Sequence, residues 1–436
     1  MIEQLQSSAK QPHSSLPFRE NSDSVKPKIL FVNRSYWPDA EATGQLLTDL
    51  CEGLSEHFDV TVLCGQPNSN PSNADFVASG IQNRHGVTIQ RLNHTKFPKS
   101  RGAGRMANLI SFTLAARRWL KQHAGFDAIV SETDPFLLPL VVQPAAAREN
   151  AAYVAYLQDI YPDIAIRLGK AKDGWFTRRI RRGLKAAYAR ADRIVVLCES
   201  MKSELMRWGL PSTSFEVVPN WVDCEQLVPV KHENIFRQRN GWNDAFVVMH
   251  SGNMGLSQKL ESLVMAVDQP SFPAHAKLVL IGGGADEAAL RDLAAEIKRS
   301  DDIEFYPYQD RADLSTTLSA ADVQVVSVDP RIGGTLMPSK LYGILASGTP
   351  VLGIASATSD LAKEIVSERI GMVARSHEPA DIADAVSAMA TWSDNERFAT
   401  QHRARALAQS TYDKSICIDR FKNILGSAIA ARRGTV

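Results

Sequence analysis

The residues best suited to bind an anion lie near position 340, where a serine and a lysine stand at the start of a predicted short helix. Pro338 suits the first turn of that helix because its φ angle is already close to the helical value. Ser339 and Lys340 would add a hydroxyl and an ammonium group to the exposed N–H groups of a helix N-terminus, and Gly348 is a suitable C-cap. The pattern predicts a phosphate site, although an ordinary loop, helix and strand of an α/β core would look the same.

Two glycine turns in the same half of the chain also follow predicted strands and precede predicted helices. They are residues 251–255 (SGNMG) and 282–284 (GGG). Open parallel sheets bind ligands at the carboxyl ends of their strands, so both turns are placed where a ligand phosphate would lie. Neither turn matches the dinucleotide or P-loop fingerprint, and each could equally be a tight turn that needs glycine.

Composition restricts the class of protein. The chain has 436 residues, enough for two or more domains, and its 44% hydrophobic content is ordinary for a globular protein. Its formal net charge of +1 gives no overall field that would attract nucleic acid. The five cysteines are scattered and form no C-x-x-C pair, which argues against disulfides or a zinc site and indicates a cytoplasmic location. We expect no signal peptide, no membrane-spanning helix, no metal and no cofactor.

The elements that must position these residues alternate between apolar strands and helices. The alternation runs through the first half of the chain and restarts after about residue 219. It predicts an α/β protein with two doubly wound, Rossmann-like parallel sheets that face a cleft. The predicted strands are residues 28–33, 60–64, 128–130, 153–157, 193–197, 246–250, 277–281, 303–306, 323–326 and 351–354. The clearest predicted helices are residues 44–57, 256–267, 286–299 and 416–432.

The same restart and the composition of the termini suggest the domain boundaries. Residues 1–26 are rich in Ser, Gln, Asn and Pro and are predicted to be a disordered tail. Residues 27–219 would form the first domain and residues 220–405 the second. A helical segment at 406–436 could pack on either one.

Taken together, these motifs resemble the family 4 glycosyltransferases, which are retaining enzymes with the GT-B fold. The resemblance is greatest to the branch that builds bacterial surface polysaccharides. It implies a nucleotide-sugar donor, UDP-linked by that branch, held mainly by the second domain, and an acceptor held mainly by the first. The residues that carry the resemblance are 191–197 (ADRIVVL), 217–223 (VVPNWVD), 251–263 (SGNMGLSQKLESL), 282–284 and 338–351 (PSKLYGILASGTPV), within about 28–425.

Two charged pairs of the family pattern are absent from this chain. The family commonly holds the donor diphosphate with an Arg and a Lys, at positions occupied here by Asn253 and Gln258. It also carries two Glu, at positions occupied here by Thr335 and Gly343.

Other cations in the same region would have to replace the missing pair. Lys340, Lys259 and Arg331 are the candidates. Lysine binds phosphate well as a point charge, and backbone amides can bind the same phosphate. The donor-binding residues that we predict are Thr43, Gly44, Gly252, Asn253, Gln258, Lys259, Gly283, Arg331, Thr335, Ser339, Lys340 and Leu341.

Asp159 is the predicted catalytic residue, and it follows a buried strand in the first domain. Its carboxylate would face the cleft and could orient or deprotonate the acceptor hydroxyl. Alternatively, Asp159 could cap the next turn, as Asp often does. Thr43 and Gly44 resemble the family's glycine loop near the diphosphate.

Two basic segments, residues 96–118 and 175–190, combine cations with aromatic and aliphatic residues. Basic amphipathic helices can lie on an anionic membrane, and a lipid-linked acceptor would explain both segments. Alternatively, they are ordinary helices with a solvated cationic face. The expected location is therefore cytoplasmic and peripheral on the inner face of the membrane.

These features predict a metal-independent hexosyl- or N-acetylhexosaminyl-type glycosyltransferase that acts on a glycan or lipid-linked acceptor in polysaccharide biosynthesis. A GT-B sugar epimerase shares the fold and is one alternative. A nucleotide-sugar-binding subunit without turnover is the other, because the glutamate pair is missing.

Overall fold

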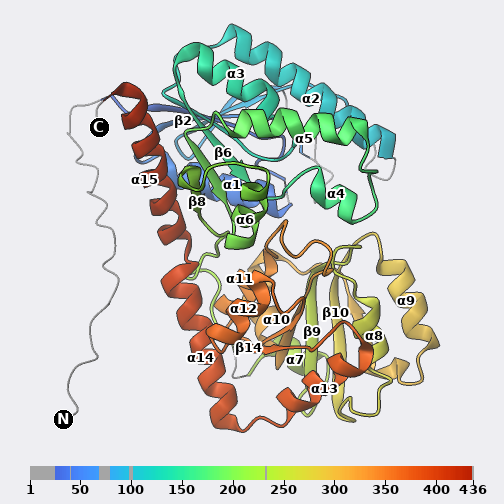
Figure 1. The fold of residues 1–436 in the computed structure, drawn as a ribbon. Coiled ribbons are helices and arrows are strands. Elements are labelled where there is room, and N and C mark those ends of the chain that lie inside the picture. Colours follow the sequence, from blue (N-terminus) through green and yellow to red (C-terminus); the bar gives the residue numbers. More distant parts are fainter. Residues whose placement is uncertain (1–24, 40, 68–78, 98–101, 231–232, 435–436) are drawn as a thin grey trace, which may run out of the picture.

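The structure is a computed structural model that describes residues 25–39, 41–67, 79–97, 102–230 and 233–434. These residues form two sheets with helices packed on them, one above the other in Figure 1. The prediction of two doubly wound α/β domains is confirmed. Residues 1–24 of the predicted tail lie outside the described residues.

The first sheet has eight strands in the order β3-β4-β2-β1-β5-β6-β7-β8. All neighbours are parallel except β3 and β4, which form an antiparallel edge. The central strands are buried along almost their whole length, which explains their continuous apolar runs. The strands are β1 (Lys28–Val32), β2 (Asp59–Cys64), β3 (Gly80–Arg84), β4 (Val87–Arg91), β5 (Ala128–Ser131), β6 (Ala152–Leu157), β7 (Arg193–Val196) and β8 (Phe215–Val217). The helices of this half are α1 (Ala42–Leu54), α2 (Gly102–Gln122), α3 (Pro139–Glu149), α4 (Asp163–Arg167), α5 (Trp175–Tyr188) and α6 (Glu199–Arg207).

The second sheet has six parallel strands in the order β11-β10-β9-β12-β13-β14. Each strand predicted from the sequence is present in one of the two sheets. The strands are β9 (Phe246–Asn253), β10 (Ala276–Gly283), β11 (Ile303–Tyr306), β12 (Val323–Ser327), β13 (Val351–Ile354) and β14 (Gly371–Val373). The helices are α7 (Ile235–Arg239), α8 (Glu261–Ala266), α9 (Glu287–Glu296), α10 (Leu314–Ser319), α11 (Lys340–Ala346), α12 (Asp360–Ser367), α13 (Pro379–Ala390), α14 (Asp394–Thr411) and α15 (Lys414–Arg433).

Two helix predictions in this half need correction at their starts. The helix predicted from residue 256 begins only at Glu261, because Lys259 has a φ of 47° and cannot continue a right-handed helix backwards. Helix α11 begins at Lys340 rather than at Pro338. Its end agrees with the prediction, since Gly348 has a φ of 62° and its N–H donates to the carbonyl of Leu345.

The C-terminal helix returns to the first sheet. Helix α15 packs against α1, β5 and β6, and its last turn forms ion pairs with the first half through Arg432 to Asp192 and Arg433 to Asp127. The backbone of Val222 pairs with that of Asp413, so the two chain crossings between the sheets run side by side. Two adjacent segments of the chain, one at Val222 and one at Asp413, therefore connect the two halves.

Candidate active site

The carboxyl ends of β9 and β10 approach each other closely at the glycine turns. Gly252 and Gly282 have φ angles of 128° and 130°, and a Cβ atom on Gly282 would lie 2.0 Å from the carbonyl oxygen of Gly252. A Cβ on Gly284 would lie 2.1 Å from the carbonyl oxygen of Met254. The close packing of two backbones therefore explains Gly282 and Gly284, and the positive φ angle explains Gly252.

Lys340 lies directly beside this edge of the second sheet. Its Nζ is 3.0 Å from Nε2 of His250, and a Cβ on Gly252 would lie 3.6 Å from the same Nζ. Burial lowers the pKa of Lys340 to about 7. Burial, and then the charge of Lys340, hold the pKa of His250 well below its usual value. Within the described residues, no carboxylate forms an ion pair with Lys340.

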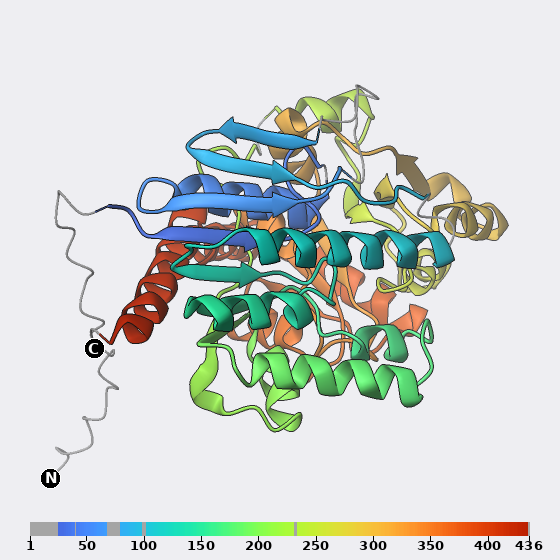
Figure 2. The ribbon, with the colours of Figure 1, turned by 90° about the horizontal axis from the view of Figure 1, so that it is seen from above.

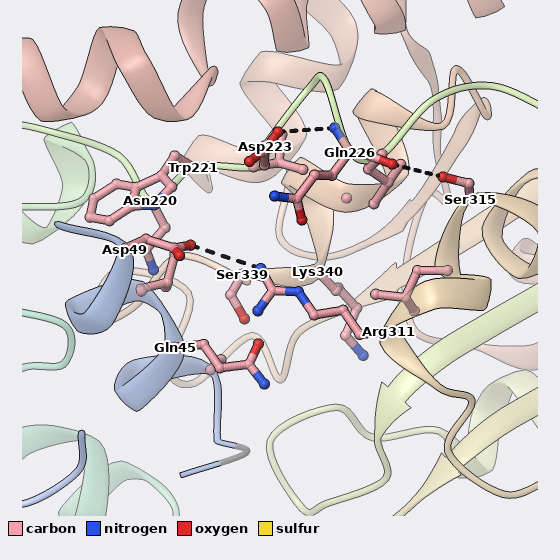
Figure 3. A pocket seen from close by; sticks show the side chains of 16 residues that line it. Gln45, Asp49, Asn220, Trp221, Asp223, Gln226, Arg311, Ser315, Ser339 and Lys340 are labelled. Atoms are coloured by element: carbon pink, nitrogen blue, oxygen red, sulfur yellow. Dashed lines mark hydrogen bonds and ion pairs between the residues drawn. The ribbon is translucent and has the colours of Figure 1, made fainter. Parts of the chain in front are cut away.

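A pocket of about 250 Å³ opens between α1, the connecting segment and the start of α11. Figure 3 shows Gln45 and Asp49 of α1 on one side and Ser339, Lys340 and Arg311 on the other. An ion pair of 4.0 Å joins Asp49 to Arg311 across the pocket. Burial raises the pKa of Asp49, although Lys414 and Arg311 act in the opposite direction.

Arg331 and Lys259, the other cations predicted to bind the donor, lie near Asp329. Arg331 pairs with the fully buried Asp329, with Nε 3.0 Å from both carboxylate oxygens, so its charge is already balanced. Lys259 is exposed on the 253–259 turn and is close enough to Asp329 to lower the pKa of that carboxyl. Arg331 and Lys259 therefore both lie near the Asp329 carboxylate.

At the first glycine turn, the side chains predicted to contact the donor form hydrogen bonds within the turn itself. The Oε1 atom of Gln258 accepts from the backbone N–H of Gly255 at 3.0 Å and from Nδ2 of Asn253 at 3.5 Å. This pair of bonds closes the turn and explains why the chain does not enter a helix there. Gly283, on the second turn, accepts from the hydroxyl of Tyr308 at 3.1 Å.

Three other predicted donor residues lie in or beside α11, and two lie in α1. Ser339 is exposed at the pocket, whereas Leu341 is fully buried in the core. Thr335 is buried, and its hydroxyl donates to the carbonyl of Ile332. Thr43 and Gly44 belong to the first turn of α1, and their neighbours Ala42 and Gln45 line the pocket.

On the first sheet, Asp159 follows β6 and lies near the ends of β1 and β5. Burial raises the pKa of Asp159 to about 6, and the negative charge of Asp134 adds to the effect. Asp134 itself pairs with Arg34 at 3.1 Å. In the described part of the chain, the Asp159 carboxylate has no hydrogen bond or ion pair, and α4 has no side-chain cap.

The residues on either side of Asp159 are held in place. Gln158 accepts from Nδ2 of Asn220 at 3.0 Å and donates to Glu132 at 3.3 Å. The backbone N–H of Ile160 donates to the carbonyl of Thr335 at 3.1 Å, across the cleft. Asp159 therefore lies on a fixed backbone between the connecting segment and the second domain.

Three buried polar residues of this region were missed by the sequence analysis. They are His250, Glu132 and Asn220, which are at most 3% exposed. The position of His250 immediately before the 251–255 glycine turn was the one available signal. Glu132 lies two residues after the predicted strand 128–130, and nothing local distinguishes it from a solvated acid.

The two basic segments contribute to one face of the first domain, where α2, α3 and α5 lie next to one another (Figure 2). On α5, Trp175 and Phe176 are 74% and 65% exposed. Arg178 pairs with Asp173 and Arg181 with Asp163. The exposed apolar residues of α2 are Met106, Ile110 and Leu114.

In the first basic segment, Lys99 and Arg101 lie outside the described residues, as does the side chain of Arg105. Among the helices that the structure describes, none combines the length and the apolar character needed to cross a membrane.

Two family models match consecutive parts of the chain. A model described as Glycosyltransferase Family 4 matches residues 43–226, and one described as Glycosyl transferases group 1 matches residues 232–406. Among curated proteins, the probable glycosyltransferase WbjE of Pseudomonas aeruginosa is 24% identical over 302 residues, covering 68% of this chain and 73% of that protein. The putative colanic acid biosynthesis glycosyl transferase WcaI of Escherichia coli (strain K12) is 23% identical over 419 residues, covering 91% and 99%.

Solved structures of low sequence identity share the fold. Sucrose-phosphate synthase from Thermosynechococcus elongatus has a TM-score of 0.73 at 17% identity, covering 93% of this chain and all of that one. Anabaena HepE in complex with UDP has a TM-score of 0.68 at 17% identity, covering 92% of this chain and all of that one. The two sheets thus have the GT-B arrangement.

Proposed function

The chain belongs to the family 4 glycosyltransferases, and on this premise we propose that it transfers a sugar from a UDP-linked donor to a glycan or lipid-linked acceptor, with retention of configuration. We place this reaction in polysaccharide biosynthesis, because WcaI is named for colanic acid biosynthesis and matches nearly the whole chain. The proposed sugar is of the hexosyl or N-acetylhexosaminyl type.

The observation that carries the proposal is the environment of Lys340. The amine of Lys340 is partly buried and has no carboxylate partner in the described residues, and it lies beside a glycine turn at the edge where open α/β sheets bind ligands. An anion would compensate its charge, and the diphosphate of a nucleotide sugar has about two negative charges for this role. The UDP complex of HepE, a protein of the same fold, supports the choice of nucleotide.

The proposed mechanism needs no metal ion and no protein nucleophile. Lys340 and nearby backbone amides would stabilise the negative charge that develops on the leaving diphosphate. Asp159 would hold the acceptor hydroxyl, and the departing diphosphate would help to accept its proton. Asp159 suits this role because its carboxylate has no partner in the described residues and its neighbours are fixed.

Two measurements test the proposal. Thermal unfolding in the presence of UDP-, GDP-, ADP- and dTDP-sugars should single out UDP-sugars, since a ligand at 100 times its Kd adds about 2.7 kcal/mol to stability. Transfer to an acceptor, followed by NMR of the anomeric proton, should show the donor configuration in the product. An inverted product would contradict the retaining mechanism.

The two alternative functions predict different products. A GT-B epimerase would interconvert UDP-sugars without any acceptor. A donor-binding subunit would bind the nucleotide sugar but neither hydrolyse nor transfer it. Either result with the pure protein would replace the proposed function.

A further inference from the structure

Lys340 and His250 form a pair of basic side chains, and no acid of the described residues pairs with either one. They are 90 positions apart in the sequence, yet Nζ of Lys340 lies 3.0 Å from Nε2 of the fully buried His250. Two positive charges at this distance would repel each other strongly in a poorly solvated site. At most one of the two groups can therefore be charged.

The other charged groups that line the same pocket each have a partner of opposite charge. Asp49 of α1 lies 4.0 Å from Arg311 and 3.8 Å from Lys414. Asp223 of the connecting segment lies 3.7 Å from Lys414. In the described structure none of these groups forms an ion pair with Lys340, so the amine faces the pocket without a counter-ion.

We infer that His250 positions Lys340 beside the donor site, and that at pH 8 Lys340 is an uncharged amine in the free protein that takes up one proton from the solvent when the donor diphosphate binds. This inference rests on the proposed function, because it takes the diphosphate as the anion. The contact between Nε2 of His250 and Nζ of Lys340 holds the amine in place, and the same Nε2 lies 3.4 Å from the carbonyl oxygen of Asn253. The other hydrogens of the amine are left for the ligand beside Gly252, where the absence of a Cβ keeps the approach open.

Burial shifts both groups in the required direction. It lowers the pKa of Lys340 to about 7 and that of His250 well below its usual range, so the imidazole is neutral at physiological pH. A bound diphosphate would raise the pKa of Lys340 again, since a nearby opposite charge favours the protonated amine. The shift between the free and bound states is the source of the proton uptake.

Calorimetry of UDP binding measures this uptake directly. The terminal phosphate of UDP is ionised above about pH 7, as its second pKa is near 6, so it does not contribute at higher pH. Titrations at pH 8 in Hepes and in Tris should differ in apparent enthalpy by an amount that corresponds to nearly one proton per UDP. The Kd should increase up to about tenfold per pH unit above pH 7, as expected for one linked proton.

Variants of the pair separate positioning from general packing. His250→Gln keeps an acceptor at about the same reach and should bind UDP within about threefold of the unaltered protein. His250→Phe fills the space without an acceptor, so it should weaken binding about tenfold and move the pH dependence to lower pH. Lys340→Met should abolish the uptake, whereas Lys298→Ala, which removes an exposed lysine beyond α9, should leave it unchanged.

The outcomes distinguish this inference from the proposed function. UDP binding with a pH-independent Kd and no proton uptake at pH 8 would overturn the inference alone, because Lys340 would already be charged. Equal behaviour of His250→Gln and His250→Phe would reject the positioning role. Failure of the unaltered protein to bind any nucleotide sugar would overturn the proposed function itself.

Discussion

Each of the two sheet edges that face the cleft has an ionisable site residue whose pKa is shifted by burial. The residue is an acid, Asp159, at one edge and a base, Lys340, at the other. Burial raises the pKa of the Asp159 carboxyl to about 6 and lowers that of the Lys340 amine to about 7. In both cases burial shifts the equilibrium toward the neutral form, because the charged form loses more by leaving water. Each group would therefore gain most from a ligand that compensates its charge.

The two groups differ in how they are held. Lys340 has a direct side-chain contact with His250, whereas the Asp159 carboxylate makes none in the described residues and depends on Gln158 and Ile160 beside it. A group held by its own side chain is suited to binding a fixed part of the ligand. A free carboxylate on a rigid backbone can adjust to a reacting hydroxyl. We therefore expect changes at Lys340 to affect binding and changes at Asp159 to affect turnover.

The largest effect should come from Asp159→Asn. This change keeps the shape of the side chain and removes its charge, so kcat should fall by about 10²-fold or more, as for loss of a general base. The donor Kd from calorimetry should stay nearly unchanged. Asp173→Asn, at an exposed position on the same domain, is the matched control. Turnover at the original rate in Asp159→Asn would remove the distinction between the two edges.

Lys340→Ala should have the next largest effect, and on binding. Loss of a charged hydrogen bond costs roughly 1.5–3 kcal/mol, which corresponds to about a 10- to 150-fold increase in the nucleotide Kd. Arg331→Ala should change the Kd by less than about threefold, because Arg331 already pairs with Asp329. It should instead lower the unfolding temperature, since it leaves a buried carboxylate unpaired.

Calorimetry and thermal unfolding of these two variants form one comparison. A larger Kd increase in Arg331→Ala than in Lys340→Ala would mean that the donor diphosphate binds at the 329–331 turn. An unchanged Kd in a folded Lys340→Ala protein would exclude Lys340 from the donor site.

The pH dependence of kcat/KM should depend on the ionisation of both Asp159 and Lys340. Asp159 must be ionised to act on the hydroxyl, so kcat/KM for the donor should rise as the pH increases through about 6. Lys340 must be protonated to hold the diphosphate, so the same quantity should fall above about 7. Asp159→Asn should lose the acidic limb and Lys340→Met the alkaline limb. A profile that is flat from pH 5 to 9 would contradict both assignments.

The smallest predicted effect concerns the outer face of the first domain. We propose that α2 and α5 dock this domain on an anionic membrane, and each cation near such a surface contributes on the order of 1 kcal/mol. Arg179→Gln and Arg182→Gln should therefore each weaken co-sedimentation with anionic vesicles about fivefold and leave UDP binding unchanged. Arg239→Gln, at an exposed site on the second domain, is the control.

Salt distinguishes electrostatic docking from other association. Raising the ionic strength from 0.1 M to 1 M shortens the Debye length from about 10 Å to about 3 Å, so binding to anionic vesicles should weaken. Equal binding to anionic and neutral vesicles, or none to either, would mean that α2 and α5 only present solvated faces.

Local patterns in the sequence were sufficient for the fold. Apolar runs such as those of β1, β6 and β10 predict buried parallel strands because a strand covered on both faces needs apolar residues at every position. The glycine that ends α11 was also predictable, since its left-handed conformation is a local requirement. The β3–β4 edge was not, because half-exposed strands leave only a weak alternating pattern.

The polar contacts of the site depended on the tertiary structure. Lys340 meets His250 because α11 and the end of β9 come together across 90 residues of sequence, and Asn220 meets Gln158 across 62. Arg331 pairs with Asp329, a contact that side-chain geometry decides and that the sequence does not specify. Sequence spacing specifies which residues share a local element, but side-chain pairing and burial depend on geometry and on neighbours that are set only when the chain has folded.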